Sequence, residues 1–138
     1  MIETTLGEAV NREPVLRRIS EQDGMSEKTK YSVTKLSRLV EQESRIFGER
    51  RLALFTELGV ERDARSDAER RMHGATLWEI RTENLPEYQK RLAELMAITV
   101  KIDWAPLRSV DLPQSKPSDR LDLGPFCELV DPDETQKP

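Results

Sequence analysis

The chain has 138 residues, a length typical of one domain with or without tails, and its single cysteine excludes an internal disulfide. Charged residues make up 35% of the sequence and apolar residues 36%, so we expect a thin core rather than a compact enzyme. The net charge of −4 arises entirely after residue 102, where eight acidic residues meet four basic ones, and such an acidic end argues against nucleic-acid binding.

Residues 1–25 are expected to form an N-terminal helical segment. Thr5 and Glu8 have the spacing of a capping box ahead of a short apolar run. Pro14 has no backbone N–H, so we expect it to break or restart this helix. Asp23 and Gly24 predict a turn before the next element.

The longest amphipathic stretch covers residues 26–58 and predicts one long helix, with Ser26 as its N-cap and Gly59 just after its end. Its apolar side chains form a narrow stripe, the seam, which the small remainder of the chain is not expected to cover. We therefore expect the seam to contact other protein subunits. The seam residues predicted to bind a partner are Val33, Leu36, Val40, Phe47 and Leu54. A second apolar row beside the seam consists of Leu39, Ile46 and Ala53.

Three positions in this helix leave alternatives open. Gly48 either marks the close approach of another backbone or is a tolerated imperfection that costs roughly 1 kcal/mol relative to alanine. Glu43 and Arg50 lie in line with the seam. They either set the register against a partner helix, as polar seam residues do in coiled coils, or lie at the edge of the apolar stripe.

Beyond this helix, residues 60–74 carry alternating charges and predict a solvated loop or a short helical extension. Residues 75–81 and 98–104 alternate apolar and polar side chains, which predicts two strands of one small sheet. Between them, Asn84 is the predicted N-cap of a shorter helix. The expected sheet core consists of Trp78, Ile80, Val100, Ile102 and Trp104.

The residues after 105 predict either a sheet edge or an extended C-terminal arm. Residues 113–119 have the composition of a linker, residues 121–130 indicate a short helix, and residues 131–138 form an acidic tail. The fold class is therefore α+β, with one long amphipathic helix, shorter helices and a small two- or three-stranded sheet. We expect a helix–sheet core domain at residues 26–112, flanked by segments 1–25 and 113–138.

No constellation of residues predicts catalysis, a cofactor or a metal site. The only histidine, His73, lies in the charged connector, and the only cysteine, Cys127, lies in an apolar patch and is expected to be a small core residue. A zinc site needs clustered cysteine and histidine ligands, and the glycines do not form a phosphate-binding loop. The sequence has no apolar run long enough to span a membrane, and its start does not resemble a signal peptide.

The stretches KYSVTKLSRLVEQE at residues 30–43 and ERRLALFTELG at residues 49–59 make up a long charged helix that closes on a Leu-Gly turn. These two stretches resemble small uncharacterised accessory or virion proteins of tailed bacteriophages. A charged connector, a short helix, a strand and a final apolar segment then follow, so the similarity covers residues 28–130. The resemblance implies a phage-encoded accessory or virion protein and carries no catalytic residues.

Two functions fit these observations. The first is a non-enzymatic phage structural or assembly protein that acts through protein–protein contacts as a repeated virion subunit, found in the virion or the host cytoplasm. Its partners would be copies of itself or other phage structural proteins. The alternative is a small phage regulator or inhibitor that binds a host protein or nucleic acid, with the acidic residues 119–134 mimicking phosphate. Acidic and basic residues interleave along the helices, which favours a salt-bridged solvated surface or a protein interface over a phosphate-binding face.

Overall fold

The computed structural model describes residues 1–112 and 123–128, and these residues form an α+β fold with one long helix, as predicted. The chain divides into two compact units, Met1–Arg45 with Ala97–Pro138, and Ile46–Met96. The long helix α2 (Glu27–Leu58) contributes its first part to one unit and its remainder to the other. These bounds differ from the expected segments 1–25, 26–112 and 113–138.

The first unit begins with a strand that the sequence patterns did not predict. Strand β1 (Ile2–Thr5) pairs antiparallel with β4 (Thr99–Ile102), and the partners run from Ile2 with Ile102 to Thr5 with Thr99. Ile2 and Ile102 are each 3% exposed, so the pair contributes directly to the core. The strand predicted at residues 98–104 is therefore confirmed in β4. Trp104 lies beyond its end, and the Trp104 amide donates to the Ile102 carbonyl in a tight turn.

Helix α1 (Leu6–Ser20) follows β1 without a loop. The predicted cap is present, because the Thr5 hydroxyl accepts a hydrogen bond of 3.2 Å from the Glu8 amide. Pro14 lies inside α1 and does not end it, which corrects the expectation of a break. The turns after Pro14 bury Val15, Leu16 and Ile19, and this packing offsets the lost backbone hydrogen bond.

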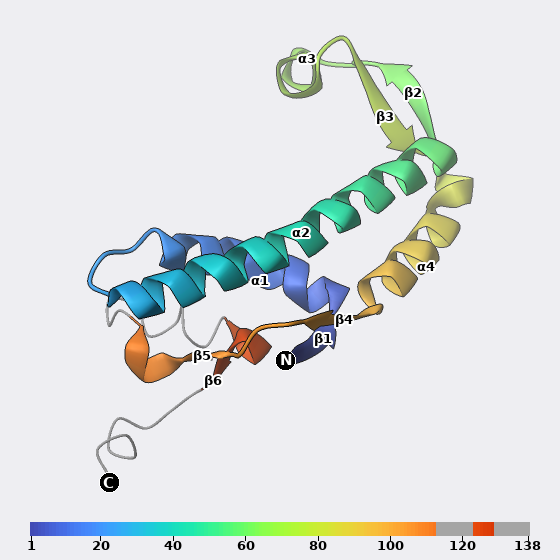
Figure 1. Ribbon diagram of the computed structural model, residues 1–138. Helices are drawn as coiled ribbons and strands as arrows, with labels where there is room; N and C mark the ends of the chain where they lie inside the picture. Colours follow the sequence, from blue (N-terminus) through green and yellow to red (C-terminus); the bar gives the residue numbers. More distant parts are fainter. Residues whose placement is uncertain (113–122, 129–138) are drawn as a thin grey trace, which may run out of the picture. The chain divides into compact units, whose positions relative to one another are not determined.

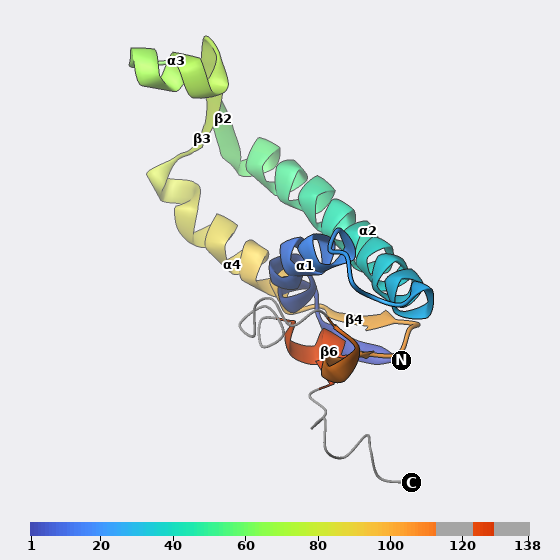
Figure 2. The ribbon, with the colours of Figure 1, turned by 90° about the vertical axis from the view of Figure 1, so that its left-hand side faces the viewer.

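Helix α2 begins at Glu27, and Ser26 caps it as predicted, because the Ser26 hydroxyl accepts a hydrogen bond from the Thr29 amide. The connection from α1 is fastened by Lys30, which donates from Nζ to the Gln22 carbonyl at 2.7 Å. Figures 1 and 2 show α1 beside the first part of α2. Val33, Leu36 and Val40 are completely buried there.

The C-terminal part of the first unit differs from the predicted short helix at residues 121–130. Its described portion is a 3-10 turn (Gly124–Phe126) followed by β6 (Cys127–Glu128), which pairs parallel with β5 (Leu107–Arg108). Glycine and proline in the turn do not support a longer helix, and Phe126 is fully buried. The linker 113–119 and the acidic tail 131–138 lie outside the described residues.

The second unit contains a β-hairpin where a solvated loop or helical extension was predicted. Strand β2 (Gly59–Asp63) pairs antiparallel with β3 (Thr76–Ile80), and helix α3 (Asp67–His73) lies in the connection between them (Figure 1). The strand predicted at residues 75–81 is confirmed, but its expected pairing with residues 98–104 is wrong. The described strands form two-stranded sheets, because β1 and β2 each take one of the two predicted strands as partner.

Helix α4 (Leu85–Met96) completes the second unit, and three contacts join its start to the end of α2. Asn84 is the last residue of a 3-10 turn (Thr82–Asn84) that leads directly into α4, and its side-chain amide donates to the Leu58 carbonyl at 3.0 Å. Phe55 and Tyr88 meet edge to face with ring centroids 6.0 Å apart. Farther along, Arg91 binds Glu57 at 2.9 Å and holds the pKa of that carboxyl below its ordinary value.

Candidate protein-interaction surface

The five seam residues predicted to bind a partner are all buried within the single chain. Val33, Leu36 and Val40 have no exposed surface, Leu54 is 4% exposed and Phe47 is 8% exposed. This corrects the expectation that the rest of the chain is too small to cover the seam. In this structure the seam is part of the core, so a partner must contact other side chains.

The apolar side chains of α2 that are exposed to solvent lie beside the seam. Ile46, from the second apolar row, is 51% exposed, and Leu52 is 66% exposed. Leu39 of that row is half-buried and Ala53 is exposed. A Cβ atom added at Gly48 would meet no atom of the described residues within 4 Å, so no other segment of residues 1–112 and 123–128 approaches α2 closely at this point.

The hairpin carries the most distinctive of the open side chains. Trp78 on β3 is 43% exposed and lies opposite Glu61 of β2, which is also exposed. The prediction that Trp78 belongs to the sheet core is therefore wrong, and so is that for Trp104, which lies outside the strand, whereas Val100 and Ile102 are buried as expected. A two-stranded sheet leaves Trp78 without a covering layer.

Further open apolar side chains occur elsewhere in the second unit. Met72 on α3 is 78% exposed, and Leu85 at the start of α4 is 40% exposed. A single exposed apolar residue is ordinary, but five in a unit of this size are enough side chains to contact another protein. The five are Ile46, Leu52, Met72, Trp78 and Leu85.

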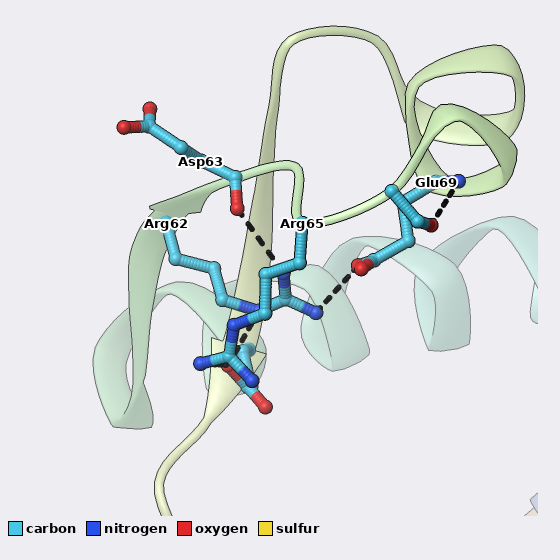
Figure 3. A network of polar contacts seen from close by, with 6 residues as sticks. Arg62, Asp63, Arg65 and Glu69 are labelled. Carbon is cyan, nitrogen blue, oxygen red and sulfur yellow. Dashed lines mark hydrogen bonds and ion pairs between the residues drawn. The ribbon is translucent and has the colours of Figure 1, made fainter.

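A network of charges centred on Arg62 connects the hairpin to α3 (Figure 3). Arg62 donates from Nη2 to the Glu69 carboxylate at 2.6 Å, and its Nε lies 2.6 Å from Glu79 Oε2. Arg62 Nη1 also donates to the Asp63 carbonyl. The hydrogen bond from Arg62 lowers the pKa of Glu69, and the same bond raises the pKa of Arg62.

This network holds α3 against the hairpin because its two carboxylates come from different elements, Glu69 from α3 and Glu79 from β3. Ser66 caps α3 and accepts a hydrogen bond from the Glu69 amide, which fixes the position of Glu69 in the first turn. The alternating charges of residues 60–74 were the only sequence signal for this arrangement. By themselves these charges predict a solvated loop or a short helical extension, because only the hairpin brings the pairing partners together.

The two residues considered for nucleophilic chemistry belong to different compact units. Cys127 is buried, as predicted, in the first unit, and His73 is exposed in the last turn of α3 in the second. Within residues 1–112 and 123–128, no group of three or more histidine, cysteine, aspartate or glutamate side chains is placed to hold a metal ion. Nor does any helix in that part of the chain have the length and apolar character needed to cross a membrane.

Comparison with known proteins does not indicate a family for the chain. No protein-family model, curated protein or solved structure matches the sequence or the fold.

Proposed function

We propose that the protein is a non-enzymatic structural or assembly protein of a tailed bacteriophage, which acts through protein–protein contacts as a repeated subunit. The resemblance of residues 28–130 to phage accessory and virion proteins supports the phage origin. The observation that carries the contact function is the set of open apolar side chains in the second unit, above all Leu52 and Trp78.

The proposed partner of this surface is a second copy of the chain. Residues 46–96 carry nine basic and ten acidic side chains, so two copies of this unit experience little net repulsion. Interleaved charges of both signs also offer ion pairs around an apolar contact. Strands β2 and β3 each keep one backbone edge without a strand partner in the described chain, and such edges readily pair with another chain.

The test is the mass of the full-length protein in solution, measured by size-exclusion chromatography with light scattering over a range of concentrations. We expect an oligomer for the native chain and a shift towards monomer for Leu52→Asp. The matched control is Gln42→Asp, which places an aspartate at another exposed position of α2 without removing an apolar side chain.

Circular dichroism of both variants verifies that α2 remains folded. A native chain that stays monomeric at every concentration would overturn the proposal, and so would equal masses for the two variants. Mass spectrometry of purified particles from a phage encoding this chain then tests the virion location. A repeated virion subunit is expected to be present in many copies per particle.

A further inference from the structure

The first unit contains a pocket of about 590 Å³ at the beginning of α2. Its walls come from the first turns of α2 and from the segment 104–112, which follows β4. Pockets of about 300–1,000 Å³ are the usual size for small-molecule sites. The pocket lies entirely within one compact unit, and none of the interactions discussed for the second unit involves it.

One wall of the pocket is apolar and contains a large aromatic ring. Trp104 is half-buried, and its ring centroid lies 6.2 Å from that of Tyr31 at an interplanar angle of 54°. Leu107 and Leu112 on the same segment are only 5% and 4% exposed, so their backbone is anchored in the core. A flat apolar group entering the pocket would thus meet a supported indole ring.

The polar part of the lining consists of three hydroxyl-bearing residues, two cations and one acid. Lys28 and Arg108 both line the pocket, against a single acidic residue, Asp111. Among the residues that the structure describes, neither Lys28 nor Arg108 forms an ion pair. The hydroxyl of Ser32 adds a donor on the next turn of α2.

We propose that this pocket binds a small organic anion in which one phosphate or carboxylate group is joined to a flat ring. The ring contacts Trp104, and the anionic group accepts charge-assisted hydrogen bonds from Lys28 and Arg108. Because two cations and an indole line the same pocket, the best-fitting ligand carries an anionic group and a flat ring in one molecule. A free inorganic anion would pair only with the cations, and an uncharged ring would contact only the indole.

The experiment is a titration of the full-length chain followed by NMR of the two tryptophan indole N–H groups. A Trp78→Phe variant assigns the Trp104 signal, because the chain has only two tryptophans. The probes are adenosine monophosphate for the phosphate class and 4-hydroxyphenylacetate for the carboxylate class. Adenosine and inorganic phosphate serve as the ring-only and anion-only controls.

We expect a saturable shift of the Trp104 indole signal with at least one of the two ring-bearing anions, and weaker binding of both controls. The double variant Lys28→Gln, Arg108→Gln should weaken that binding by about tenfold or more, since it removes two charged donors. The matched control Lys35→Gln, Arg38→Gln changes two exposed basic residues of α2 that do not line the pocket, and should bind as the native chain does.

Three results would overturn the proposal. The first is the absence of a saturable Trp104 shift with either ring-bearing anion. The second is adenosine binding as tightly as adenosine monophosphate, and the third is equal affinity in the two double variants. The oligomer mass of the pocket variants is measured in parallel, so that failure of this site is distinguished from failure of the self-association surface.

Discussion

Substituting Leu36 and Leu52 by alanine makes the clearest test of how α2 divides between core and open surface. Both residues lie in the same helix and lose the same atoms, but Leu36 is completely buried whereas Leu52 is 66% exposed. The helix propensities of the two variants are therefore equal, and any difference in the free energy of unfolding reports the surroundings of the side chain.

The expected magnitudes follow from burial. Replacing leucine by alanine removes three carbon groups, worth about 0.8 kcal/mol each when fully buried, or about 2.4 kcal/mol. The cavity left at position 36 raises the loss to about 3–5 kcal/mol. For Leu52→Ala, most of the removed surface already faces water, so the change should stay within about 0.5 kcal/mol.

The assay is urea unfolding of the full-length chain followed by circular dichroism at 222 nm. With a slope of about 1.5 kcal/mol per molar urea, a loss of about 3 kcal/mol lowers the midpoint of Leu36→Ala by about 2 M. The midpoint of Leu52→Ala should remain close to that of the native chain. Equal midpoint shifts in the two variants would refute the assignment of the seam to the core.

Three further predictions concern two glycines and one ion pair in the second unit. Gly48→Ala should stabilise the protein by about 1 kcal/mol, because the added methyl group meets open space inside a helix. Gly59→Ala should destabilise it by about 1–3 kcal/mol, because its Cβ would collide with the Phe55 carbonyl oxygen and approach that of Glu79 at 3.2 Å. Urea unfolding measures both changes. Arg62 holds the pKa of Glu69 below its ordinary value of 4.5, so this stabilisation is complete above pH 4.5 and is lost as the pH falls through the folded-state pKa. Hydrogen-exchange protection of the Ala64 amide, which bonds the Ala75 carbonyl beside α3, should decline in that range in the native chain and show no such step in Arg62→Gln.

The long helix could be predicted from the sequence because its signals are local and agree with one another. Ser26 caps the start, Leu58 ends the helix before Gly59, and the apolar period between them continues for many turns. The strands at residues 76–80 and 99–102 were recognisable for the same reason, since their alternation is visible within a few residues.

What the sequence did not reveal depends on contacts between distant segments. Strand β2 reads as a charged loop because Glu61, Arg62 and Asp63 are adjacent, and only pairing with β3 makes it a strand. The short β1 likewise becomes a strand only through its partner, more than ninety residues later in the sequence. The seam was predicted correctly as an apolar face, but a periodic pattern does not tell which part of the chain covers that face.

The junction at residues 58 and 59 has a mechanical consequence. Helix α2 ends at Leu58 and β2 begins at the next residue, so no linker separates the helix from the hairpin. The crowding around Gly59 and the bond from Asn84 to the Leu58 carbonyl make this joint stiff. A force applied to the hairpin by any bound molecule would therefore be transmitted to the end of the helix as torque, instead of being absorbed by a flexible connection.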